Sequence, residues 1–294
     1  MLEHTLAWCR HWGLWSMLLL VCGLSAAQTV VRDDSRRDII MSTPPQRIVS
    51  LLPAITEMVC ELGACERLVG VDRYSNHPAS VLALPRLGGM DDTPLEALIK
   101  LQPDLILLAA SARVLPRLQK MGWPVMVFEP RDQADTDRMG QALSRALTGR
   151  DQAWSDYQQR QQRAWDELAA QVKPAWRGAR VYVEVGEGPY VAADNSFIGQ
   201  GLRRLGLHSA VSGQWGPFPR LNPEWVLRHP PDWIVLGQTA RAPATRPGWE
   251  HLPTLQNRRV CVLSAAQMDT LVRPGPRLHQ GMAAILSCLS GTPS

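Results

Sequence analysis

The sequence predicts an α/β fold made of two halves, each with a parallel-rich sheet, joined by one long helix. Two observations lead to this fold class. Short apolar runs typical of buried strands alternate with helical patterns before residue 132 and again after Pro174, and the stretch between them is long, polar and helical in pattern. Strands that alternate with helices form parallel sheets that are covered on both faces.

The first half begins with "TVVRDDSRRDIIM" (29–41), where apolar and polar residues alternate on both sides of a polar turn, which predicts a β-hairpin. "RIVSLLP" then predicts a buried strand, and "AITEMVCELGAC" an amphipathic helix that ends near Gly63. "RLVGVD" and "DLILLAA" predict further strands, and "VLPRLQKMGWPVMVFEP" predicts a helix followed by a strand. We therefore expect residues 28–148 to form an N-terminal lobe.

The connecting segment is predicted to be a helix over residues 149–173. "TGR" at 148–150 interrupts the helical pattern, and Pro174 ends it. A helix of about 20 residues spans about 30 Å, which is long enough to join two lobes. A surface helix packed on a single lobe is the alternative. The apolar residues of the second part lie near one stripe of the helix: Ala153, Trp154, Tyr157, Trp165, Leu168 and Val172.

The second half repeats the alternation over residues 174–294. "ARVYVEV" and "RRVCVLS" predict strands, and "SFIGQGLRRLG" and "GPRLHQGMAAILSCL" predict helices. We therefore expect a C-terminal α/β lobe.

One helix–strand unit occurs in both halves. "TPLEALIKLQPDLILL" (93–108) and "NPEWVLRHPPDWIVL" (222–236) share a Pro near the helix start, a Glu after it, and Pro-Asp before an apolar run. In the first copy Thr93 is the expected N-cap of a capping box with Glu96, and in the second Asn222 is the expected N-cap beside Glu224. Capping accounts for both glutamates locally. The alternative is that each lobe presents one exposed carboxylate to a partner with twofold pseudosymmetry.

The first 27 residues are predicted to be a signal peptide. Arg10 and His11 precede the apolar segment "WGLWSMLLLVCGL", and "SAAQ" follows with small residues, so cleavage is expected after Ala27. The apolar run is shorter than the about 20 residues that span a bilayer. A lipid anchor at Cys22 and an uncleaved membrane anchor are the alternatives. We expect an exported protein.

Cysteine and charge content narrow the function classes. An exported chain permits disulfides, and sequence proximity favours Cys60 with Cys65 and Cys261 with Cys288 among the three pairings. No His lies at a metal-ligand spacing from these cysteines, so a structural zinc site is not expected. The net charge is +4, but the basic residues are scattered, so the sequence does not support nucleic-acid binding.

Several motifs together resemble a known family. "PPQRIVSLLPAITEMVCELGACERLVGVDRYSNHP" (44–78), "LPRLGGMDDTPLEALIKLQPDLILLA" and "RPGPRLHQGM" (273–282) are similar to helical-backbone (class III) periplasmic substrate-binding proteins. Those proteins serve ABC importers of cobalamin, haem and ferric siderophores. The resemblance covers residues 30–289 and is strongest to the cobalamin-binding branch, through "YSNHP" and "MDTLVRPGPR".

The resemblance implies two Rossmann-like lobes bridged by one long helix, a ligand in the cleft between them, and a monomer in the periplasm. It implies no cofactor, since the chelate is cargo. It also implies that Glu96 and Glu224 dock onto arginines of a dimeric permease. The expected ligand-binding residues are planar side chains and one Asp–Arg pair: Tyr74, Tyr190, Trp215, Phe218, Asp269 and Arg273.

Other ligands and classes stay open on the sequence alone. The loops "GGMDD" and "ASARVL" lack the tryptophans that cobalamin binders of this type carry there, so haem and ferric siderophores are alternatives, with Tyr74 or His77 as a haem ligand. An enzyme would need an acid–base pair such as Glu184 and Glu187, but the chain has no nucleophile elbow and no glycine-rich phosphate loop. A scaffold protein would require a collapsed cleft.

Overall fold

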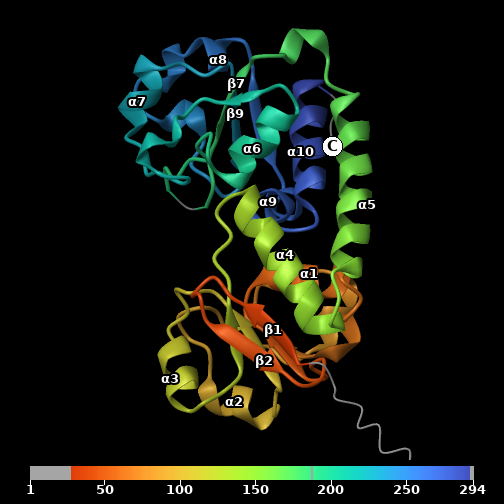
Figure 1. Cartoon of the computed structure of the whole chain (residues 1–294). Coiled ribbons are helices and arrows are strands. Elements are labelled where there is room, and N and C mark those ends of the chain that lie inside the picture. Colours follow the sequence, from red (N-terminus) through yellow and green to blue (C-terminus); the bar gives the residue numbers. More distant parts are fainter. Residues whose placement is uncertain (1–27, 187, 292–294) are drawn as a thin grey trace, which may run out of the picture.

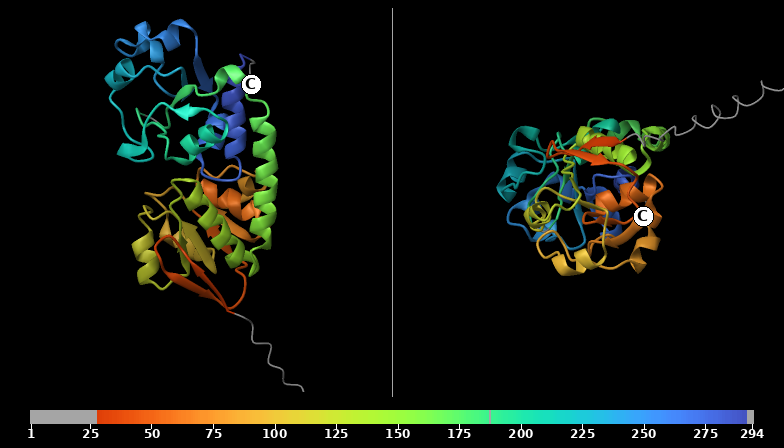
Figure 2. Two further views of the ribbon diagram at one scale, coloured as in Figure 1. Left: turned by 45° about the horizontal axis from the view of Figure 1, so that its top comes forward. Right: turned by 60° about the horizontal axis from the view of Figure 1, so that its bottom comes forward.

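The computed structural model describes residues 28–186 and 188–291, in which two α/β lobes are stacked end to end with α5 (Gln152–Ala169) along one side (Figures 1 and 2). The expected leader, with Cys22 and Ala27, lies outside the described residues, as does Glu187. None of the helices in the described ranges is both long and apolar enough to cross a membrane.

The N-terminal lobe is built on a parallel sheet of order β4-β3-β5-β6. Its central strand β5 reads Leu-Ile-Leu-Leu and is buried throughout, because helices cover both faces. Successive residues of β5 enter opposite cores: Leu105 and Leu107 join one hydrophobic cluster, and Ile106 and Leu108 the other. The elements are β3 (Ile48–Ser50), α1 (Pro53–Glu61), β4 (Leu68–Val71), α2 (Leu95–Lys100), β5 (Leu105–Leu108), α3 (Leu115–Lys120) and β6 (Val125–Val127).

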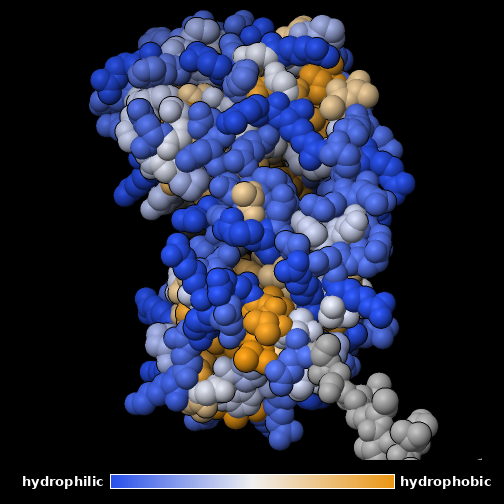
Figure 3. Space-filling model, viewed as in Figure 1, coloured by the Kyte–Doolittle hydropathy of each residue, from blue (hydrophilic) through white to orange (hydrophobic). Residues whose placement is uncertain are grey.

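The predicted hairpin is confirmed. β1 (Thr29–Arg32) pairs antiparallel with β2 (Asp38–Met41), and Val31 packs into the core of the lobe. The outer face of the hairpin is apolar at Val30 and Ile40, which are cross-strand partners and are 55% and 63% exposed. Figure 3 shows this apolar patch on a face that is otherwise largely hydrophilic.

The connecting helices follow the predicted break. α4 (Gln133–Thr148) ends at Gly149, which takes a left-handed conformation with φ 72°, and α5 begins three residues later. The buried stripe of α5 divides between the lobes: Trp154 and Tyr157 belong to the N-terminal core, and Trp165 and Leu168 to the C-terminal core. Because the two ends of α5 pack into different cores, it connects the lobes instead of covering one of them.

Gly140 lets α5 pack closely on α4. A Cβ at Gly140 would lie 2.0 Å from Cζ3 of the buried Trp154 ring, so Gly140→Ala is expected to lower the free energy of unfolding by about 1–3 kcal/mol. Urea denaturation measures this loss. Gly275→Ala is the matched control, because its nearest contact would be an ordinary 3.5 Å. Equal losses in the two variants would contradict the packing argument.

The C-terminal lobe repeats the design with a parallel sheet of order β10-β9-β7-β8. Val181 and Val183 of β7 face the cluster that receives α5, while Tyr182 faces the opposite one. The elements are β7 (Arg180–Val183), α6 (Phe197–Arg204), β8 (His208–Ser209), α7 (Pro223–Arg228), β9 (Trp233–Gly237), α8 (Pro253–Gln256), β10 (Val260–Leu263), α9 (Ala265–Val272) and α10 (Leu278–Leu289).

The expected disulfides are both present. Cys60 pairs with Cys65 at the end of α1, and Cys261 of β10 pairs with Cys288 of α10. The second bond ties the closing helix to the sheet on which it packs.

The recurring unit differs between the lobes at its helix start. Asn222 caps α7 by accepting from the backbone N–H of Glu224, as expected. The predicted capping box at Thr93 is wrong: its hydroxyl donates to the Gly89 carbonyl, and α2 begins at Leu95 with no side-chain cap. Glu96 still lies in the first turn, and both Glu96 and Glu224 are exposed.

Candidate functional site

A cavity of about 520 Å³ lies between the lobes. Its N-terminal wall comes from segments that follow β3, β4, β5 and β6, and Val185 follows β7 in the other lobe. The carboxyl ends of parallel strands are the usual place for ligands in open α/β sheets. The side chains that line it are mostly apolar: Leu52, Pro53, Ala54, Tyr74, Met90, Ala109, Ser111, Phe128, Glu129, Pro130, Val185, Phe197, Ile198, Phe218, Asp269, Val272, Arg273 and Pro274.

The cavity brings together some of the expected ligand residues and not others. Tyr74, Phe218, Asp269 and Arg273 line it, with Phe218 packed against Phe197 at 5.4 Å between ring centroids. Two expected residues are not among the lining side chains. Tyr190 forms a backbone bridge with Arg220, and Trp215 lies edge-on to Trp225; both aromatic side chains are about half exposed.

Arg273 is engaged by the protein itself. Its Nη1 donates to Glu57 Oε1 and to Asn76 Oδ1, both at 2.8 Å, and its Nη2 donates to the Tyr74 carbonyl at 3.1 Å and contacts Asp269 Oδ2 at 2.8 Å. The residue is 8% exposed. Both terminal nitrogens of the guanidinium are therefore occupied, and most of these contacts cross from one lobe to the other. The Asp–Arg pair named from the sequence is present as a contact between Arg273 and Asp269 at the end of α9.

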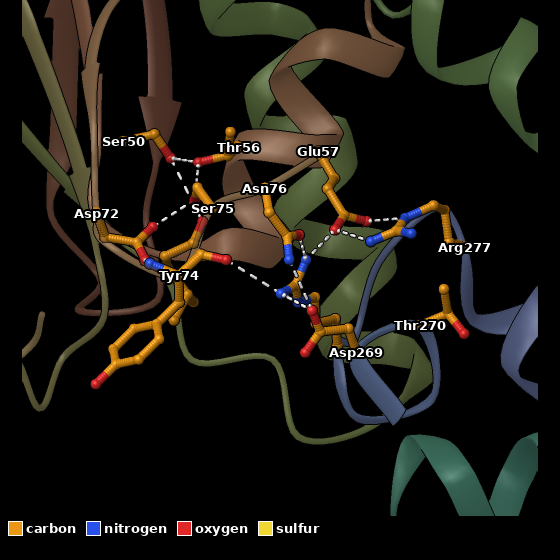
Figure 4. A network of polar contacts seen from close by, with 12 residues as sticks. Ser50, Thr56, Glu57, Asp72, Tyr74, Ser75, Asn76, Asp269, Thr270 and Arg277 are labelled. Atoms are coloured by element: carbon orange, nitrogen blue, oxygen red, sulfur yellow. Dashed lines mark hydrogen bonds and ion pairs between the residues drawn. The ribbon is translucent and has the colours of Figure 1, made fainter. Parts of the chain in front are cut away.

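Glu57 is the centre of this interlobe network. It is 3% exposed and accepts from Arg273 and from Arg277, whose Nε lies 2.9 Å from Oε2 and whose Nη2 lies 2.5 Å from Oε1. Asn76 donates to Asp269 Oδ2 at 2.8 Å. Figure 4 shows Glu57, Asn76, Asp269 and Arg277 converging on this region, while the Tyr74 ring points away from it.

The sequence did not identify Glu57, Asn76 or Arg277 as site residues. A carboxylate in the first turns of a helix that follows a buried strand, together with a second arginine four residues after Arg273, was the available signal. Neither feature indicates by itself that the two segments meet.

A chain of buried hydroxyl groups supports the backbone next to Tyr74. Ser50, Thr56 and Ser75 are linked at 2.8 Å and 2.9 Å, and Ser75 donates to Asp72. Burial raises the pKa of Asp72, and hydrogen bonds from the Ser75 hydroxyl and the Tyr74 N–H oppose that rise. This chain fixes the turn from which the Tyr74 side chain extends, 61% exposed.

A second cavity of about 370 Å³ adjoins the first and shares Leu52, Pro53, Tyr74 and Met90 with it. The loop around Met90 is held in place because Asp92 accepts from the Gly89 N–H and pairs with Arg73. The loops "GGMDD" and "ASARVL", which lack the aromatic residues of cobalamin binders, therefore still reach the cleft. The first contributes Met90 to its lining and the second Ser111.

His77 is exposed and does not line the main cavity, whereas Tyr74 does. Partial desolvation of the exposed ring, and next the positive charge of the nearby Arg277, lower the pKa of His77. In the described ranges no group of three or more His, Cys, Asp or Glu side chains is arranged to hold a metal ion.

The contacts of Glu184 do not support an acid–base pair of Glu184 with Glu187, the pair that an enzyme would need. Glu184 is the member of that pair that the structure describes. Glu184 is 4% exposed and pairs with Arg246 through two contacts, at 2.6 Å and 2.9 Å. Tyr182 donates to the same carboxylate at 3.3 Å, and the guanidinium lies over the Trp249 ring. Glu184 is thus part of a buried ion pair that braces the C-terminal lobe.

The two-lobe fold and its cleft agree with comparison to known proteins. A family model described as periplasmic binding protein matches residues 48–266, which is most of the chain. The chain belongs to this family. An uncharacterised ABC transporter substrate-binding lipoprotein of Bacillus subtilis is 26% identical, over 92% of this chain and 94% of the relative. A vitamin B12-binding protein of Pectobacterium atrosepticum is 28% identical, over 84% of this chain and 89% of the relative.

Among solved structures, the periplasmic haem-binding protein BhuT in complex with two haems superposes with a TM-score of 0.70. It is 25% identical, and the match covers 85% of this chain and 99% of that one. The family members in these comparisons are binding proteins and not enzymes, and their ligands are substrates of transport instead of resident cofactors. Relatives that bind different chelates show similar degrees of likeness, so the family does not decide the ligand.

Proposed function

We propose that this protein is a periplasmic solute-binding protein that captures a large metal chelate, a cobalamin-type corrinoid, in the interlobe cleft and delivers it to an ABC permease. The observation that carries the proposal is the cavity of about 520 Å³, bounded by strand ends of both lobes and adjoined by a second one of about 370 Å³. Ligand sites of this kind are mostly apolar and carry a few fixed polar groups. Tyr74 and Phe218 supply flat aromatic surface for a macrocycle.

Export is part of this proposal. The leader ending at Ala27 directs the chain out of the cytoplasm, and the disulfides Cys60–Cys65 and Cys261–Cys288 suit an oxidising compartment. A lipid anchor at Cys22 is the alternative, and the B. subtilis relative named as a lipoprotein supports it. No catalytic step belongs to the proposed function.

Haem is the second candidate, with a specific observation in its favour. The Tyr74 side chain is exposed and lines the cleft, and a phenol oxygen is an established axial ligand of haem iron. A ferric siderophore is the third ligand that the family makes plausible.

Delivery would use Glu96 on α2 and Glu224 on α7, one in each lobe (Figure 1). Both are exposed, and neither lines the cleft, so docking leaves the ligand undisturbed. Rim charges of this kind set the register and rate of association more than its affinity. We expect the protein to dock as a monomer.

Fluorescence titration tests the proposal. Cyanocobalamin, haemin and a ferric hydroxamate are each titrated into the purified protein, whose tryptophans report binding through quenching. Saturable quenching at micromolar ligand is expected for the corrinoid. Tighter binding of haemin would favour the second candidate, and a Tyr74→Phe variant would then lose the absorption band of an iron–phenolate bond. Absence of binding by all three ligands would overturn the proposed function.

A further inference from the structure

Two of the three charged side chains that line the cleft are carboxylates. Glu129, Asp269 and Arg273 are the charged side chains in its lining. Arg273 is 8% exposed and committed to Glu57, Asn76, Asp269 and the Tyr74 carbonyl. A guanidinium held in this way has little left to offer a ligand carboxylate. Among the charged side chains of the lining, Glu129 and Asp269 therefore remain to accept hydrogen bonds from a ligand.

Both carboxylates keep oxygen atoms for a ligand. Asp269 uses Oδ2 for Asn76 and Arg273, and its side chain is 36% exposed. Figure 4 shows its other oxygen directed away from the network. Glu129 is exposed, and its Oε2 accepts from the backbone N–H of Ala110 at 3.1 Å, which orients the group after β6 without neutralising it.

Arg273 offsets one of the two carboxylates, so the charged lining keeps one net negative charge. Three arginines on the loops that border the cleft pair with aspartates, Arg73 with Asp92, Arg113 with Asp91 and Arg131 with Asp135. Arg86, on the loop that carries Tyr74, donates to the backbone carbonyls of Asp72 and Ser75. The chain as a whole carries a net charge of +4, so the acidic lining departs from the charge of the protein. Charges that line a cleft with low-dielectric walls act on a ligand more strongly than scattered surface charges do.

We infer that Glu129 and Asp269 make the cleft select chelates whose rim is neutral or positively charged and rich in N–H donors, and reject chelates whose rim carries ionised carboxylates. The inference rests on the proposed function, that this cleft binds a chelate, and it specifies the ligand class. Carboxamide side chains donate to carboxylates and suffer no repulsion from them. Like charges placed together across an interface lower affinity and exclude the wrong ligand. Corrinoid amides and cationic ferric hydroxamates satisfy this requirement, whereas haem propionates do not.

Matched ligand pairs test the inference. Cyanocobalamin is compared with its monocarboxylic acid, in which one amide is hydrolysed, and haemin with its bis-amide, in which both propionates are neutral. The wild-type protein is expected to bind the neutral member of each pair about tenfold more tightly, with a ratio that shrinks as salt is added. Ferrioxamine, a cationic ferric hydroxamate, is titrated as well. Its affinity relative to cyanocobalamin shows whether the cleft prefers a siderophore or a corrinoid within this charge class.

Glu129→Gln is the decisive variant, because glutamine keeps the size of the side chain and can still accept from the Ala110 N–H. It is expected to bring the acid-to-neutral ratio toward one by strengthening binding of the acid form. Glu66→Gln, an exposed carboxylate outside the cleft, is the control and keeps the wild-type ratio. Equal binding of acid and neutral forms by the wild type, or an unchanged ratio in Glu129→Gln, overturns the inference and leaves the proposed function standing. If no member of either pair and no hydroxamate binds, the proposed function itself fails.

Discussion

Replacing Glu57 with glutamine is expected to lower the free energy of unfolding by about 3–5 kcal/mol, because it leaves buried arginines without their shared carboxylate. Glu57 is 2% exposed at its side chain, and Arg273 and Arg277 are 9% and 14% exposed. Asp269 would then be the one carboxylate left in contact with Arg273 in the described network. The loss is also expected to loosen the contact between lobes, because Glu57 lies on α1 and both arginines follow α9.

Chemical denaturation measures the loss of stability, and hydrogen exchange at α1 and at residues 273–277 measures the loosening. Glu66→Gln is the control and should change stability by no more than about 0.5 kcal/mol, as exposed substitutions usually do. In the double variant Glu57→Gln with Arg277→Gln, the combined loss should be smaller than the sum of the single losses, because the second change removes a stranded charge. Strict additivity, or a wild-type stability for Glu57→Gln, would contradict the network's role.

Reversing the two charges proposed to dock on a permease, in Glu96→Arg with Glu224→Arg, is expected to abolish ligand uptake by cells while leaving ligand affinity unchanged. The two side chains are exposed, one on each lobe, and outside the cleft lining. Arginines of a permease would meet arginines on both lobes, and like charges set against each other prevent docking. Uptake of labelled ligand in a strain whose own binding protein is deleted measures the effect.

Capping predicts a different result for the same variant. A carboxylate in the first turn of a helix stabilises it by about 0.3–1 kcal/mol, so a helix-start role predicts a small loss of stability and normal transport. Reversal of Glu66 and Glu250, which are also exposed, controls for the change in net charge. Normal uptake by the Glu96→Arg, Glu224→Arg variant would leave capping as their one role.

Local pattern predicted the elements of this fold well because each signal acts over a few residues. The fully apolar "LILL" predicted a strand with both faces covered, and β5 is buried along its length. The polar turn in residues 29–41 predicted the hairpin, and Gly149 ends α4 in the left-handed conformation that glycine adopts readily. The proximity argument for Cys60–Cys65 and Cys261–Cys288 also succeeded.

The error at Thr93 has a tertiary cause. Asp92 pairs with Arg73, which lies after β4, and this contact holds the loop from Gly89 to Asp92 against the turn that carries Tyr74. The Thr93 hydroxyl then bonds within that loop, to Gly89, instead of capping α2. A capping pattern in the sequence contains no information about the contact of Arg73 with Asp92, which joins residues nineteen positions apart and holds this loop.

For the candidate site, the sequence by itself determined which residue types lie at the strand ends, since Tyr74, Asp269 and Arg273 follow or border predicted elements and do line the cleft. Only the tertiary structure decided what those residues face. Arg273 contacts Glu57, which lies 216 residues earlier in the chain. Because of this contact, the arginine that was expected to bind a ligand links the two lobes instead, and Glu129 and Asp269 are left facing the cavity. The physical reason is range: strands, caps and turns follow from neighbouring residues, whereas the partner of a buried charge is set by how the two lobes pack against each other.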